Sequence, residues 1–138
     1  MDQIILECDE TGKPTGGYVD KEVAHTGAGR HHLAITVLVY NSGNQVLLQR
    51  RKHKVFDNIW DMTASTHQLH LAGHDESDEE ATLRSLKREY DIDQVLNLQN
   101  LGGINYFAQY DNLCENEHDK ILKALYYCPI NLNNEFLY

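Results

Sequence analysis

Hydrophobic and polar residues follow a helical period in one part of this chain and an alternating period in several others. Between positions 77 and 92 the apolar residues recur every three or four positions, which predicts a short amphipathic helix. Ser77 and Glu80 have the spacing of a capping box and predict where this helix begins. Its apolar stripe consists of Ala81, Leu83, Leu86 and Tyr90.

The first half of the chain contains the patterns of two hairpins. The clearest strand runs from Leu33 to Tyr40 and is rich in β-branched and aliphatic residues. A turn at positions 41–44 then returns the chain along Gln45–Gln49 as its partner. The apolar run Ile4–Glu7 ends in a turn-rich stretch that is typical of a hairpin connection.

The second half predicts two further strands. Ile104–Tyr110 alternates as a half-buried strand does, and another strand begins near Cys114. Cys128 is predicted to lie on the apolar face of that last strand, in the core. Trp60 is predicted at a buried strand end, before a loop rich in histidine. We expect residues 1–138 to form one domain, which either ends early or lacks a C-terminal element.

Composition and charge narrow the classes of function. The chain has 138 residues, enough for a real core, and a net charge of −9, which argues against nucleic acid as a partner. One basic cluster, around Arg50, Arg51 and Lys54, suits a small anion such as a diphosphate, although a solvated surface explains it equally well on composition. Three cysteines without paired spacing do not predict a disulfide scaffold. No apolar run is long enough to span a membrane and no signal peptide is evident, so a cytoplasmic protein is expected.

A set of histidines and carboxylates has the chemistry of a metal site. Imidazole and carboxylate ligands together suit a borderline divalent ion such as Zn²⁺ or Mn²⁺. Glu115 and Glu117 are two residues apart on a predicted strand, so they point to the same face. A lone histidine is more often a hydrogen-bonded residue than a ligand. The spacing of these residues alone therefore favours ordinary hydrogen bonding over a metal site. The candidate ligands are His25, His32, His67, Glu115 and Glu117.

The helical stretch resembles a degenerate Nudix box, the motif in which several glutamates on one helix bind metal ions. Glu76, Arg84 and Glu89 match the first glutamate, the arginine and the last glutamate of that motif. Ser85 and Arg88 stand where the motif has two further metal-binding glutamates, and Asp91 replaces its glycine. The resemblance implies the Nudix fold, an α/β/α sandwich around a mixed β-sheet.

The particular pattern of losses resembles the isopentenyl-diphosphate isomerase branch of that superfamily. Segments around Pro14, His25, His32 and Glu115–Glu117 also resemble that branch, so the likeness covers nearly the whole chain. It implies one metal held by the five candidate ligands, Mg²⁺ on Glu89 bridging to the diphosphate of a small-molecule substrate, and Arg50, Arg51 and Lys54 near the phosphates. It also implies catalytic roles for Glu117 and Tyr106, and a 1,3-allylic proton shift.

One position departs from that branch and leaves three functions open. Ser65 stands where the isomerases have a catalytic cysteine, and a serine hydroxyl is a far weaker acid than a thiol. Moving a double bond requires one proton to be added and another removed, so Ser65 would need a proton from elsewhere. Trp60-Asp61-Met62-Thr63 is closer to isomerase-like Nudix hydrolases, although hydrolysis normally uses the missing glutamates. The alternatives to an isomerase are therefore a diphosphate hydrolase and a diphosphate-binding protein with weak catalysis.

Overall fold

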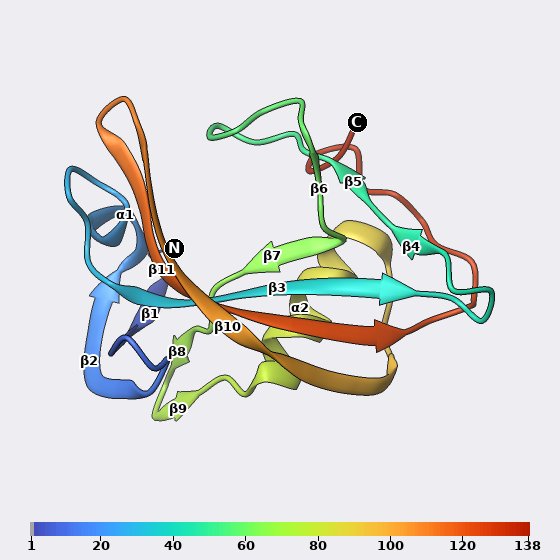
Figure 1. Cartoon of the computed structure of the whole chain (residues 1–138), viewed down its shortest axis with the longest axis horizontal. Coiled ribbons are helices and arrows are strands. Elements are labelled where there is room, and N and C mark those ends of the chain that lie inside the picture. Colours follow the sequence, from blue (N-terminus) through green and yellow to red (C-terminus); the bar gives the residue numbers. More distant parts are fainter. Residues whose placement is uncertain (1) are drawn as a thin grey trace.

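A mixed β-sheet dominates the computed structural model, which describes residues 2–138 (Figure 1). Its strands occur in the order β10-β11-β3-β1-β2, with the short strands β4 and β7 also paired to β3. β3 and β11 run parallel, with His32 opposite Glu117, whereas the other pairs are antiparallel. The helices are α1 (Lys21–Ala24) and α2 (Asp78–Tyr90). The strands are β1 (Ile4–Cys8), β2 (Pro14–Asp20), β3 (His32–Tyr40), β4 (Val46–Leu47), β5 (Gln49–Arg50), β6 (Trp60–Asp61), β7 (Ala64–Thr66), β8 (His70–Leu71), β9 (His74–Asp75), β10 (Leu96–Tyr110) and β11 (Leu113–Leu125).

Helix α2 begins where the sequence predicts. The backbone N–H of Glu80 donates to Ser77 Oγ (3.1 Å), and the N–H of Ser77 donates to Glu80 Oε2 (2.7 Å), so both bonds of the capping box are present. At its end, Asp91 adopts a left-handed conformation (φ 58°), which replaces the glycine usual at such a cap. This conformation gives the backbone carbonyls of Leu86 and Lys87 in the last turn a hydrogen-bond donor, the N–H of Asp91.

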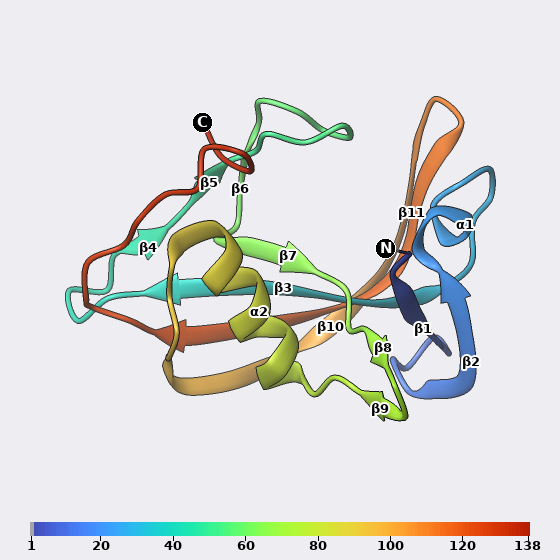
Figure 2. The ribbon, with the colours of Figure 1, turned by 180° about the vertical axis from the view of Figure 1, so that it is seen from behind.

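Helix α2 lies over one face of the sheet (Figure 2), and residues of its apolar stripe pack into the core there. Leu86 packs in one cluster with Ile35 and Val37 of β3 and with Leu122 of β11. Because side chains alternate along a strand, His32 and Thr36 of β3 point to the opposite face from Ile35 and Val37. The polar residues of β3 therefore lie away from the helix.

Several boundaries differ from the sequence prediction. The partner of β3 is shorter than Gln45–Gln49, because only Val46 and Leu47 pair with it. Trp60 is 68% exposed rather than buried, since β6 pairs only with β5 among the described strands. Cys128 is exposed, so its placement in the core is wrong: β11 ends at Leu125 and the chain turns away before Cys128.

Strand β10 is longer and more exposed than the predicted half-buried strand. It begins at Leu96 and pairs with β11 along most of its length. Ile104 and Phe107 are each 55% exposed, because β10 forms the edge of the sheet. After β11, the C-terminal segment runs back beside β5, where the N–H of Lys52 donates to the carbonyl of Phe136 (3.1 Å) (Figure 1). None of the helices in the described part of the chain is long and apolar enough to cross a membrane.

Candidate metal and acid–base site

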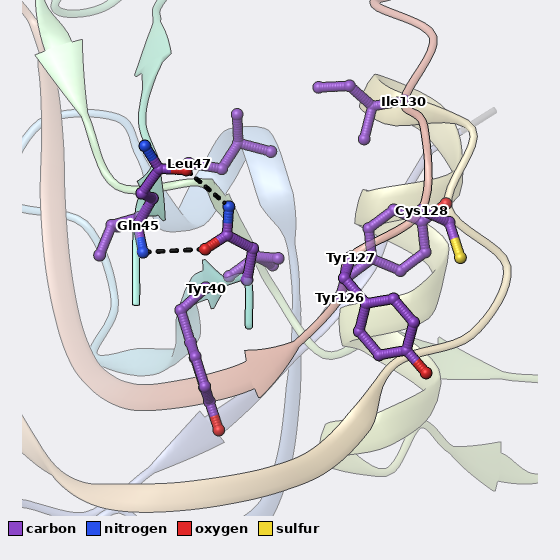
Figure 3. Close-up of a pocket in the computed structure, with 10 residues that line it drawn as sticks. Tyr40, Gln45, Leu47, Tyr126, Tyr127, Cys128 and Ile130 are labelled. Atoms are coloured by element: carbon purple, nitrogen blue, oxygen red, sulfur yellow. Dashed lines mark hydrogen bonds between the residues drawn. The ribbon is translucent and has the colours of Figure 1, made fainter. Parts of the chain in front are cut away.

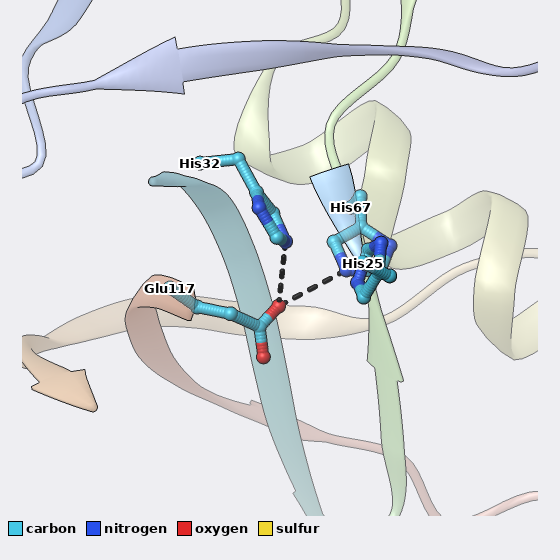
Figure 4. Close-up of side chains that lie close together, drawn as sticks. All are labelled: His25, His32, His67 and Glu117. Carbon is cyan, nitrogen blue, oxygen red and sulfur yellow. Dashed lines mark hydrogen bonds and ion pairs between the residues drawn. The ribbon is translucent and has the colours of Figure 1, made fainter. Parts of the chain in front are cut away.

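Four predicted ligands meet on the polar face of the sheet (Figure 4). His25 follows α1, His32 opens β3, His67 follows β7, and Glu117 lies on β11 opposite His32. One ligand atom from each lies within 4.8 Å of the others. Three imidazoles and one carboxylate are a donor set that suits Zn²⁺ or Mn²⁺.

The hydrogen bonds of the histidines orient their rings toward a common point. His25 Nδ1 lies 2.6 Å from the carbonyl of Lys21, and His32 Nδ1 lies 2.7 Å from the carbonyl of Arg30. A carbonyl accepts only, so each of these Nδ1 atoms carries the proton and each Nε2 presents a lone pair. Such bonds to the outer ring nitrogen hold metal-ligating histidines in place.

His32 and Glu117 supply the test of whether a cation fits. His32 Nε2 lies 3.2 Å from Glu117 Oε2, although its Nδ1 already uses the one proton of a neutral ring. The two facing atoms are then both acceptors, and they need either a second proton on His32 or a cation between them. Both residues are buried, so water does not screen this contact. The residues present therefore fit a bound divalent cation.

Burial and charge shift the pKa values of the residues in this cluster in different directions. Burial lowers the pKa of His67 to about 4, so that ring is neutral and able to act as a ligand. Burial alone would raise the pKa of Glu117, but the hydrogen bonds with His32 and His67 outweigh it and hold that pKa below its ordinary value. Glu117 is therefore an ionised carboxylate beside the neutral ring of His67.

Tyr106 connects this cluster to Glu115. Its hydroxyl lies 2.8 Å from Glu115 Oε2 and also contacts Glu117 Oε1. Burial and the charge of Glu117 raise the pKa of Tyr106, so the phenol keeps its proton and donates it. Burial also raises the pKa of Glu115. Glu115 is thus bound to Tyr106 and is not part of the group of four that the structure brings together.

Ser65 lies in a separate hydrogen-bonded array on the same face. Its Oγ is 3.2 Å from Thr36 Oγ1, and Thr36 donates to Asp119 Oδ2 at 2.7 Å. Asp119 is buried, which raises the pKa of its carboxyl to about 7. The sequence analysis missed Thr36 and Asp119. A period of two from His32 through Thr36, and from Glu117 to Asp119, could have identified them as neighbours on one face.

Glu89 is presented by α2 beside an arginine, as the helical spacing predicts. Glu89 as a whole residue is 5% exposed, and its Oε2 has no hydrogen-bond partner among residues 2–138. Burial raises its pKa to about 7, opposed by the charges of Arg88 and Arg51. The other box positions are engaged elsewhere: Glu76 forms an ion pair with Arg84 (2.7 Å), and the Ser85 hydroxyl donates to the carbonyl of Thr82 (2.8 Å).

The three basic residues predicted near the phosphates have different environments. Arg51 donates to Asp61 (3.1 Å) and to the carbonyls of Val55 and Phe56. The Arg50 guanidinium lies 6.0 Å from the ring centre of Tyr138, and Lys54 is exposed. Arg51 therefore shapes its own loop, whereas Arg50 and Lys54 face solvent.

One cavity lies away from these clusters, and a second borders Tyr106. The first, of about 390 Å³, is lined by Tyr40, Tyr126 and Tyr127 (Figure 3). Tyr40 ends β3 and His32 begins it, so this cavity lies at the far end of the strand. The other, of about 640 Å³, is lined in part by Tyr106, Phe107 and Asn116, so it borders the tyrosine that contacts Glu115 and Glu117.

Comparison with known proteins gives one family and several relatives that carry the same enzyme name. The profile of the NUDIX domain matches residues 30–135. The isopentenyl-diphosphate Delta-isomerase of Pectobacterium atrosepticum is 32% identical over 135 residues, covering 88% of this chain and 73% of that protein. The enzyme of the same name from Haloarcula marismortui is 31% identical over 113 residues, covering 79% of this chain and 57% of that protein. With some other curated relatives, the chain spans only 37–38% of their length.

Solved structures agree on the fold. The DR0079 protein of Deinococcus radiodurans superposes with a TM-score of 0.67 at 16% identity, covering 99% of this chain and 80% of that one. The MutT protein of Methanosarcina mazei superposes with a TM-score of 0.58 at 18% identity, covering 78% of this chain and 73% of that one. At such identities the likeness concerns the arrangement of the sheet and α2.

Proposed function

The chain belongs to the NUDIX family, in its isopentenyl-diphosphate isomerase-like branch, and from that premise we propose a metal-dependent enzyme that shifts a proton in a small diphosphate. The observation that carries this proposal is the double role of Glu117. Its Oε2 belongs to the four-ligand cluster, whereas its Oε1 contacts the Tyr106 hydroxyl. One carboxylate therefore joins a cation site to a group that holds a proton.

The reaction needs two proton transfers and no other change of bonding. A C–H bond forms at the terminal alkene carbon, another breaks at the allylic carbon, and the double bond moves between them. Glu117 and Tyr106 form the acid–base pair on one side of the substrate, with Glu115 accepting a hydrogen bond from Tyr106. A divalent cation bound by the histidines would supply the positive charge that keeps Glu117 ionised.

Ser65 is the group on the other side and makes the first transfer slow. Its hydroxyl is hydrogen-bonded to Thr36 (3.2 Å), which orients it without making it acidic. A thiol at this position would have an ordinary pKa of about 8.5, far below that of a serine hydroxyl. General acid–base assistance contributes about 10²–10⁴-fold, so isopentenyl diphosphate should turn over slowly or not at all in the natural chain.

The diphosphate of the substrate belongs beside α2 in this proposal. Glu89 would hold Mg²⁺, since its buried Oε2 lacks a partner in the described chain and carboxylate oxygens suit that ion. Arg50 and Lys54 are exposed and free to approach the phosphates, whereas Arg51 positions their loop. The hydrolase alternative is weaker, because Glu76 is committed to Arg84 and Glu89 alone remains to bind metal on the helix.

Deuterium uptake from heavy water into isopentenyl diphosphate tests the proposal. We expect slow or no uptake with the natural chain and measurable uptake with Ser65→Cys, a nearly isosteric change. Ser42→Cys, in an exposed turn, is the matched control and should behave as the natural chain does. Adding Glu117→Gln to Ser65→Cys should abolish the gain. If the natural chain and Ser65→Cys are both inactive while metal stays bound, the site does not isomerise and diphosphate binding without catalysis becomes the better function.

A further inference from the structure

Arg88 occupies a position on α2 where the Nudix box has a metal-binding glutamate, and it is only loosely paired. Its nearest guanidinium nitrogen lies 3.8 Å from Glu89 Oε1, beyond hydrogen-bond distance. Its Nε is buried without a partner among residues 2–138, and its side chain is 34% exposed. The guanidinium lies 4.8 Å from the ring centre of Phe136, so the C-terminal segment fixes its plane.

Arg88 also lies in a group of positive charges. It follows Arg84 by one helical turn, so both project from the same face of α2. Arg84 donates to the backbone carbonyl of His67 at 2.7 Å, so this face of α2 contacts the segment that carries one of the four ligands. Lys21 is anchored near the same cluster, because its carbonyl accepts the hydrogen bond of His25.

These cations differ in whether a carboxylate lies beside them. Arg84 has Glu76 as its carboxylate partner, and Arg51 has Asp61. The Lys21 ammonium instead donates to the amide oxygen of Gln3 at 3.2 Å, which carries no charge. Within the described chain, Lys21 and Arg88 therefore lack the close carboxylate partner that Arg84 and Arg51 have, in a protein of net charge −9.

We propose that Arg88 is a ligand of the substrate diphosphate and supplies there the positive charge that a second metal ion on the box helix supplies in other Nudix proteins. This inference rests on the proposed diphosphate site. A planar guanidinium matches phosphate oxygens with two parallel hydrogen bonds, and Phe136 holds that plane in place. Replacing a metal-binding glutamate by arginine reverses the local charge by two units, so the site binds the anion directly and needs fewer Mg²⁺ ions.

Binding of inorganic diphosphate, measured by calorimetry at fixed Mg²⁺ and ionic strength, tests this role. We expect Arg88→Gln to weaken binding about 10- to 100-fold, as the loss of a charge-assisted hydrogen bond would. Arg88→Lys should recover only part of the affinity, because an ammonium lacks the planar fork. Lys87→Gln is the matched control: Lys87 is the neighbouring cation, 52% exposed and paired with Asp91, and its loss should change affinity less than two-fold.

Mg²⁺ dependence separates a ligand role from a structural one. Arg88→Glu restores the glutamate of the box, so its diphosphate affinity should depend on Mg²⁺ concentration more steeply than that of the natural chain. A merely structural Arg88, holding Phe136, would lower the melting temperature without changing that dependence. The role is overturned if folded Arg88→Gln and Lys87→Gln bind diphosphate equally well. If the natural chain itself binds no diphosphate, the proposed function fails as well, and if it binds normally while Ser65→Cys shows no deuterium uptake, only the isomerase assignment fails.

Discussion

The four-ligand cluster predicts a metal-dependent rise in melting temperature that disappears when one ligand is removed. A ligand that binds only the folded state stabilises it by about 2.7 kcal/mol at 100 times its dissociation constant. Unfolding entropy is about 2.1 cal/mol/K per residue, which gives about 0.29 kcal/mol/K for a chain of 138 residues. Mn²⁺ or Zn²⁺ at that concentration should therefore raise the melting temperature by roughly 9 °C.

Glu117→Gln removes the carboxylate at the centre of the cluster and keeps its shape. If metal affinity falls about 100-fold, the same metal concentration stabilises the variant by only about 0.4 kcal/mol, or roughly 1–2 °C. Thermal unfolding followed by circular dichroism, with and without metal after chelation, measures both shifts. Each shift is taken within one variant, so any change in metal-free stability cancels.

His74→Gln is the control for binding elsewhere on the surface. His74 is exposed and pairs with Glu80 outside the cluster, so its loss should leave the shift near 9 °C. Equal shifts in the natural chain, Glu117→Gln and His74→Gln would refute the reasoning, because the metal would then be bound at another place. No shift in any of them would show that the histidines and Glu117 are held together without a metal.

Two further predictions concern α2. The pKa of Glu89 is raised by burial from 4.5 to about 7, so the folded metal-free protein holds a proton that the unfolded chain releases. Its stability should fall as the pH rises from about 4.5 through about 7, by at most about 3 kcal/mol, and urea denaturation should show a smaller fall for Glu89→Gln. Nucleoside diphosphate derivatives should release negligible phosphate in Mg²⁺, because Ser85 and Arg88 replace box glutamates; robust release that is lost in Glu89→Gln would instead favour the hydrolase.

The local part of the fold could be predicted from the sequence, whereas its long-range geometry could not. The capping box at Ser77 and the strand up to Tyr40 depend on neighbouring residues, and both are confirmed. Trp60 and Cys128 were placed wrongly because their burial depends on which strands lie beside them. A tryptophan on an outlying two-stranded sheet has no second layer to cover it, and no local pattern reveals that.

In the candidate site, too, the sequence predicts the local arrangement and not the long-range one. Spacing alone places Glu115 and Glu117 on one face, but it cannot bring either to His25, which comes from another strand connection. The resemblance supplied that grouping, and the structure brings together four of the five ligands while Tyr106 takes Glu115. The closeness of Lys21 to the cations of α2 could not be predicted from the sequence, because these residues are far apart along the chain.

The positive charges on α2 and the four-ligand cluster on the sheet explain how the loss of box glutamates could change the reaction from hydrolysis to proton transfer. In a box with several acids, the cations on the helix neutralise the diphosphate and also activate water for attack on phosphorus. Here the helix keeps Glu89 and gains Arg88, a side chain that can neutralise phosphate but cannot activate water. The carboxylate that can move a proton, Glu117, lies instead on the sheet among three histidines. In the proposed assignment, diphosphate binding and proton transfer therefore belong to different elements, α2 and β11, and a substitution in one should leave the other intact.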